Sequence, residues 1–202
     1  GTTLIIFFIA AYFIIPEELG LFSYLMALVT LLMIVADFGL SISISKYVAE
    51  LKNKNSESLK RILFSVSLVT IGMALLVSIF LVTAGRFIFN EYKLLFLFLP
   101  YLFLFPLTSV ADGVYRGLKE FKKLSIINVV VAIFSLILSF FLIKQFGLMG
   151  AILSQNLLFF LLTISLLLFR KETEFKWDKK ATGNIIKYAI LVGFVNIGAF
   201  LF

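Results

Sequence analysis

Residues 124–143 read LSIINVVVAIFSLILSFFLI, and residues 148–169, after a link of four residues, read LMGAILSQNLLFFLLTISLLLF. A helix needs about 20 predominantly apolar residues to cross the hydrocarbon core of a bilayer. Both runs are that long, and neither contains a charged residue. They are continuous, whereas membrane β-strands alternate apolar and polar residues. Because lipid cannot hydrogen-bond the backbone, we expect two membrane-spanning helices joined by a very short turn.

The same pattern extends along the whole chain, so the predicted fold class is an all-α integral membrane protein, a polytopic helical bundle. We expect about six complete transmembrane helices plus the start of a seventh. The expected spans are residues 1–15, 21–47, 62–84, 94–115, 124–143, 148–169 and 188 onward, with a tight turn over 16–20 and polar links over 50–61 and 85–93.

Both ends of the chain lie inside apolar runs, at Gly1 and at Phe202. We therefore expect a fragment of a longer protein. It divides into a six-helix lobe over residues 1–169, a basic loop over residues 170–187 and the start of a seventh helix over residues 188–202.

Composition supports a membrane protein and argues against several kinds of enzyme. Hydrophobic residues make up 62% of the chain, whereas a globular protein is about half apolar. Cysteine and histidine are absent, so we expect no metal site and no cofactor. We also find no paired carboxylates on one loop and no glycine-rich phosphate loop, and we predict that the chain is not an enzyme.

The cationic residues predict an orientation. Of the 18 Lys and Arg residues, fifteen lie in three segments, 46–61, 116–123 and 170–187. Cytoplasmic loops of membrane proteins carry an excess of Lys and Arg, so these segments and the N-terminus are expected in the cytoplasm. The net charge of +7 is explained by this topology and by anionic lipid, without nucleic acid as a partner.

Two acidic residues fall within or near the expected spans. Asp37 precedes Lys46 by about 13 Å of helix, well inside the membrane. A charge there costs at least about 2.5–3.5 kcal/mol, so Asp37 either lines a cavity, as a substrate or coupling-ion carboxylate, or forms a packing pair between helices. Asp112 lies four residues before Arg116, a spacing that favours a structural ion pair. Arg116 is also able to bind phosphate through two hydrogen bonds.

Other residues of the spans predict close packing or polar contacts. Gly113 and Gly117 form a small-xxx-small pair that allows two helices to approach closely. Pro100 and Pro106 are expected to kink the fourth span. Polar side chains within the spans are Asn128, Gln155 and Asn156, together with Ser41 and Ser45 on the face below Asp37. They either hydrogen-bond neighbouring helices or line a polar strip suited to sugar hydroxyls.

Several of these stretches together resemble a known family. They are Leu19–Tyr24, Ala36–Ser41, Lys46–Glu50, Asp112–Lys119 and Phe146–Ala151, with Gln155-Asn156 after them. The pattern resembles the O-antigen and oligosaccharide flippases of the multidrug/oligosaccharidyl-lipid/polysaccharide exporter superfamily, and it covers essentially the whole chain.

The resemblance implies the N-terminal lobe of a two-lobe transporter that carries a lipid-linked oligosaccharide across the cytoplasmic membrane by alternating access. The expected partners are that glycolipid, membrane lipids and the missing C-terminal lobe. Lys46 and Arg116 match the cations thought to hold the pyrophosphate, and Asp37 is a possible coupling group. Two alternatives stay open, a cation-coupled multidrug exporter of the related branch and a membrane-embedded enzyme of glycan assembly.

Overall fold

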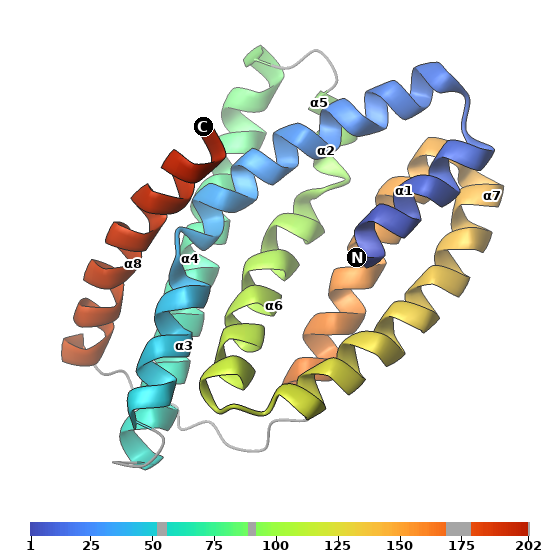
Figure 1. The fold of residues 1–202 in the computed structure, drawn as a ribbon. Helices are drawn as coiled ribbons and strands as arrows, with labels where there is room; N and C mark the ends of the chain where they lie inside the picture. The colour runs from blue at the N-terminus through green and yellow to red at the C-terminus, as the bar shows by residue number, and fades with distance from the viewer. Residues whose placement is uncertain (52–55, 89–91, 169–178, 202) are drawn as a thin grey trace.

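A computed structural model of the chain describes residues 1–51, 56–88, 92–168 and 179–201, and these residues form an all-helical bundle (Figure 1). The helices are α1 (Thr2–Phe13), α2 (Pro16–Asp37), α3 (Leu40–Leu51), α4 (Ser56–Ile88), α5 (Tyr92–Phe96), α6 (Leu99–Gly117), α7 (Phe121–Leu168) and α8 (Lys179–Leu201).

The two apolar runs quoted first lie in α7, which folds back on itself. Its backbone leaves the helical region at Gly147, where φ is 54° and ψ is −127°, a conformation that suits glycine. The two limbs then run antiparallel and in close contact, because a Cβ atom built on Gly150 would collide with the carbonyl of Leu142. The very short turn predicted here is confirmed (Figure 1).

The second expected span is not continuous, because it is divided into α2 and α3. Asp37 is the last residue of α2, and Phe38 and Gly39 follow with φ of 37° and 77° in the left-handed region. Phe38 N–H still bonds the Ile34 carbonyl, at 3.0 Å, and Ser43 N–H bonds the Gly39 carbonyl, at 3.1 Å. The break therefore redirects the chain while keeping both helix ends bonded.

Several predicted boundaries are wrong, among them the link expected over residues 85–93, since α4 continues to Ile88. Residues 16–20 are not a turn, because Pro16 begins α2 and its acidic neighbours Glu17 and Glu18 suit a helix N-terminus. The polar link expected up to residue 61 ends earlier, since α4 starts at Ser56. Similarly, α8 starts at Lys179 and not near Tyr188, so residues 179–187 of the expected basic loop are helical. Residues 170–178 lie outside the described residues.

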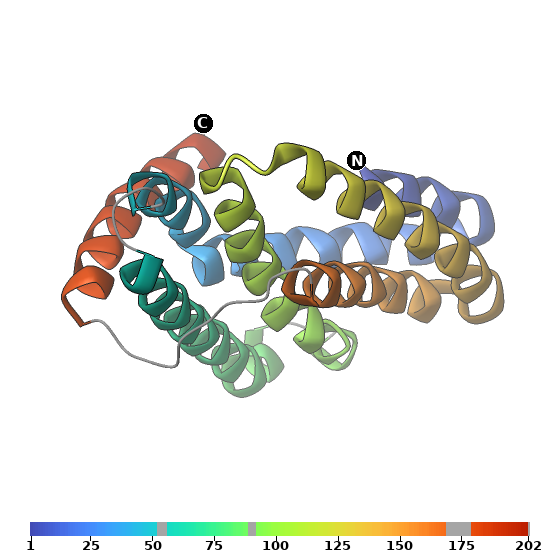
Figure 2. The same cartoon turned by 90° about the horizontal axis from the view of Figure 1, so that it is seen from below.

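Helix α6 occupies the middle of the bundle and contacts α2, α3, α4 and α7 (Figure 2). On one side α3, α4 and α8 enclose a small apolar cluster that includes Ile44, Val48 and Ile185. On the other side α1, α2 and α7 enclose a larger one that includes Phe22 and Leu25. Both clusters reach α6, so side chains on this helix meet neighbours from both halves of the bundle.

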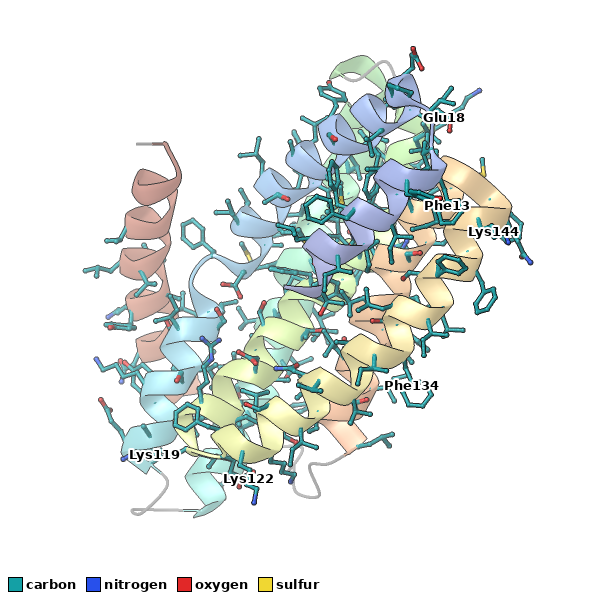
Figure 3. The ribbon with its side chains drawn as sticks, turned by 45° about the vertical axis from the view of Figure 1, so that its right-hand side comes forward. Phe13, Glu18, Lys119, Lys122, Phe134 and Lys144 are labelled. Atoms are coloured by element: carbon teal, nitrogen blue, oxygen red, sulfur yellow. The ribbon has the colours of Figure 1, made fainter. Side chains whose placement is uncertain are left out.

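The outer surface of the bundle is largely apolar. Large hydrophobic side chains such as Phe8, Leu76, Phe134 and Leu191 are exposed, and Phe134 projects outward from α7 (Figure 3). Within the residues that the structure describes, three segments, Pro16–Leu51, Arg61–Thr83 and Phe121–Leu168, form helices that are long and apolar enough to cross a membrane. The fold-back at Gly147 divides the last segment into two limbs. The chain is an all-α membrane protein.

The helix ends that flank the three basic segments gather at one end of the bundle, at the bottom of Figure 1. Lys119 and Lys122 lie at this end, whereas Glu18 and Lys144 lie at the opposite end (Figure 3). The fold thus brings to a single side the helix ends that flank basic segments far apart in the sequence.

Candidate functional site

Helices α3 and α6 meet backbone to backbone. A Cβ atom built on Gly113 would collide with the carbonyl oxygen of Ser41, and one on Gly117 would lie 2.5 Å from that of Ser45. The predicted close approach at this glycine pair is confirmed, and the small residues that it faces are the two serines. The polar faces of the second and fourth spans are therefore adjacent.

A pocket of about 590 Å³ lies beside this contact, between α1, α2, α6 and the second limb of α7, and we call it the deep pocket. The residues that line it are Thr3, Met26, Thr30, Met33, Ile34, Asp37, Gly39, Ser41, Tyr101, Phe105, Ser109 and Phe159. Asp37 is the one charged group in this lining, and four hydroxyl-bearing residues of Ser and Thr type accompany it.

The Asp37 carboxylate is held at the start of α3. Its Oδ2 accepts a hydrogen bond of 2.9 Å from Ser41 Oγ. The N-terminus of a helix favours a negative charge, and the backbone N–H groups of Ser41 and Gly39 also interact with the carboxylate. The protein thus holds the carboxylate at the break between α2 and α3.

Aromatic rings form the α6–α7 side of the deep pocket. The ring of Phe159 lies 4.8 Å from that of Tyr101, edge to face, and 5.3 Å from that of Phe105. Such contacts fix ring orientations. Tyr101 is buried, whereas Phe105 and Phe159 are half-buried, so these two rings keep part of their surface toward the pocket.

A second and shallower pocket, of about 420 Å³, lies toward the basic end of the same helix pair, and we call it the basic pocket. The residues that line it are Ile42, Ser45, Lys46, Ala49, Arg116, Gly117, Lys119 and Phe121. Arg116 Nη2 pairs with Asp112 Oδ2 at 2.7 Å, across one helical turn. Lys46 Nζ lies 4.0 Å from the centre of the Tyr188 ring of α8.

Of the seven charged and amide residues predicted for a site, four therefore gather along the α3–α6 contact. Asp37 is in the deep pocket, Lys46 and Arg116 are in the basic pocket, and Asp112 joins this group through its ion pair with Arg116. Asn128 is half-buried on the first limb of α7 and is not among the residues lining either pocket.

The adjacent amides Gln155 and Asn156 lie in the second limb of α7, also outside both pocket linings. Asn156 Nδ2 donates to the Leu97 carbonyl at 2.8 Å, at the point where α5 ends before α6. It thereby satisfies a backbone acceptor that precedes the α6 N-cap. Gln155 is fully buried, and its side-chain oxygen and nitrogen have no hydrogen-bond partner in the described part of the chain.

Several lining residues were not among the predicted ones. Tyr101, Phe105 and Phe159 belong to apolar runs in which sequence alone does not distinguish a pocket wall from a packed core. Lys119 was predicted as a cation of a cytoplasmic loop and as part of a family-like stretch, and not as a site residue. Among the described residues, no three acidic, histidine or cysteine side chains gather as metal ligands.

A model of the family described as "Polysaccharide biosynthesis protein" matches residues 1–202, which is the entire chain. No curated protein and no solved structure matches the chain.

Proposed function

We propose that this chain, which belongs to the polysaccharide biosynthesis protein family, is the N-terminal lobe of a flippase for a lipid-linked oligosaccharide. With a second lobe, it would carry the glycolipid headgroup across the cytoplasmic membrane by alternating access while the lipid tail stays in the bilayer. The observation that carries this proposal is the adjacency of a basic pocket and a hydroxyl-lined pocket on one helix pair.

The basic pocket supports recognition of the phosphate groups. Arg116, Lys46 and Lys119 bring three cations to one shallow depression, and guanidinium binds phosphate through paired, charge-assisted hydrogen bonds. By the positive-inside rule this end faces the cytoplasm, where the glycolipid would enter. The ion pair with Asp112 orients Arg116 in the absence of substrate.

The deep pocket supports the passage of a polar headgroup. Its hydroxyl groups and the Asp37 carboxylate offer hydrogen-bond partners within the membrane-spanning part of the chain. One observation favours the second candidate, a cation-coupled multidrug exporter, because a carboxylate with aromatic rings beside it also suits an organic cation. The basic pocket favours the flippase, since it would repel such a cation on entry.

The proposal is tested by Arg116→Ala and Asp37→Ala in the complete transporter, with Lys144→Ala as the control because Lys144 is a cation at the opposite end (Figure 3). We expect Arg116→Ala to lower glycolipid transport into proteoliposomes at least about tenfold, since a hydrogen bond to a charged group is worth about 1.5–3 kcal/mol. Membrane insertion should be unchanged in all three variants, because the partly exposed Arg116–Asp112 pair adds only about 0–1 kcal/mol of stability and Asp37→Ala removes a charge that is costly within the membrane.

The measured outcomes separate the two candidates. Normal glycolipid transport by both Arg116→Ala and Asp37→Ala would contradict the proposal that the two pockets bind the glycolipid. Efflux of an organic cation by the wild-type protein, together with no glycolipid transport, would favour the multidrug exporter.

A further inference from the structure

We propose that the deep pocket is a carbohydrate-stacking subsite, in which Phe105 and Phe159 pack against one sugar ring while the polar residues of the α2–α3 wall hydrogen-bond its hydroxyls. This inference rests on the proposed function and assigns a role to two aromatic residues that neither the sequence patterns nor the family match singled out.

The first argument is the chemistry of the pocket walls. A sugar ring has apolar faces made of C–H groups and an edge of hydroxyls. The face of an aromatic ring is electron-rich and apolar, so it attracts such C–H groups. Phe105 and Phe159 lie 5.3 Å apart and keep part of their surface toward the pocket. The opposite wall, from α2 and α3, supplies the polar groups Thr30, Asp37 and Ser41.

The second argument is the position of the Asp37 carboxylate. Asp37 lines the pocket, and a hydrogen bond of 2.9 Å from Ser41 Oγ holds its Oδ2 in place. A carboxylate accepts hydrogen bonds from more than one donor, and sugar hydroxyls are donors of the required kind. The wall formed by α2 and α3 therefore offers a fixed polar partner for the hydroxyl edge of a sugar ring.

The third argument is the spacing between the two pockets. Ser109 lines the deep pocket and Arg116 the basic pocket, on the same helix. Seven residues of helix correspond to about 10 Å. A sugar in the deep pocket is therefore close to a phosphate held in the basic pocket, so the subsite would bind a sugar near the lipid-linked end of the glycan.

The test compares Phe105→Leu and Phe159→Leu with Phe103→Leu in the complete transporter. Phe103 is on the same helix as Phe105, but it lines a different pocket, on the α4 side. The two probes are a polyprenyl diphosphate that carries sugar and the same lipid without sugar. We expect both pocket variants to bind the glycosylated lipid about two- to tenfold more weakly than wild type. Binding of the bare lipid should not change, and Phe105→Tyr should restore glycolipid binding.

The proposal is overturned if Phe105→Leu and Phe159→Leu bind the glycosylated lipid as Phe103→Leu does. It is also overturned if these variants weaken binding of tetraphenylphosphonium and leave glycolipid binding unchanged, since the pocket would then hold an organic cation. If the wild-type protein moves no glycolipid at all, the proposed function itself fails.

Discussion

Helix α6 has two interfaces of different construction. Toward α3 it presents Gly113 and Gly117, which let the two backbones touch. Toward α7 it uses side chains: Thr108 Oγ1 lies 2.7 Å from Thr163 Oγ1, and Tyr115 Oη donates to the Leu166 carbonyl at 3.1 Å. The first interface is set by the absence of side chains and the second by their hydrogen bonds.

This difference predicts how each interface responds to mutation. Where two backbones touch, an added side chain has no room and the neighbour cannot move aside without breaking its own helix. Where single hydrogen bonds join the helices, each bond adds a modest amount, and its loss leaves the helix contact in place. The α3–α6 pair should therefore be intolerant of change and the α6–α7 pair comparatively tolerant.

The largest effect is expected for Gly113→Leu. Its side chain would have to occupy the position of the Ser41 carbonyl, so we expect a loss of about 3 kcal/mol or more in the free energy of unfolding. The measurement is the yield of monodisperse protein in detergent and its thermal midpoint. Gly72→Leu on α4 is the matched control, because nothing lies within 4 Å of a Cβ atom there. Equal yields of the two variants would contradict the backbone contact.

The next effect is expected where the tight packing continues to α8. Gly39 has a φ of 77°, and its Cβ would lie 2.9 Å from the Ala189 carbonyl. Gly39→Ala should lower the free energy of unfolding by about 1–3 kcal/mol, through backbone strain and this contact. Thermal unfolding in detergent measures the loss, with Gly183→Ala in α8 as the control, since a Cβ atom there meets nothing within 4 Å. A Gly39→Ala protein as stable as that control would show that the break does not require glycine.

A smaller loss of stability is expected when Asn156 is replaced, whereas replacing its neighbour Gln155 should leave stability unchanged or raise it. Asn156→Leu removes the donor to the Leu97 carbonyl, for a loss of about 1–2 kcal/mol. Gln155→Leu removes two buried polar atoms that have no partner among the described residues, so its stability should equal or exceed that of wild type. Thermal midpoints of the two variants measured side by side test the pair, and a less stable Gln155→Leu would mean that the amide has a partner.

The smallest effect is expected at the threonine pair. Thr108→Val and Thr163→Val each remove one side of a 2.7 Å contact, and hydrogen bonds between membrane helices average about 0.6 kcal/mol. A double-mutant cycle on thermal stability should give a coupling of that size. Strictly additive losses would show that the two hydroxyls do not interact.

Sequence reasoning found the features that depend on local pattern. The apolar runs around residue 147 predicted the α7 hairpin, and Gly113 with Gly117 predicted a close helix contact. It missed the start of α8 at Lys179, because a polar and basic stretch reads as a loop although Lys is a good helix former. It also treated Pro16 as a turn residue, whereas proline is equally suited to the first turn of a helix.

Features that depend on which helices meet could not be predicted from the sequence. The sequence placed Asp37 inside the membrane, but the pocket beside it is completed by α1, α6 and α7. Asn156 and Gln155 are adjacent and chemically alike, yet one bonds a carbonyl 59 residues away and the other bonds no described residue. Only the packing of α7 against the α5–α6 junction distinguishes them.

The rigid contact between α3 and α6 has a consequence for any ligand long enough to reach both pockets. Once one part of such a molecule is bound, its other part is confined near the second pocket at a high effective concentration, and two weak contacts act as one strong one. This gain requires that the pockets keep a fixed separation, which two helices in backbone contact provide. Fragments carrying only one of the two groups should therefore bind far more weakly than the intact molecule, even where every individual contact is preserved.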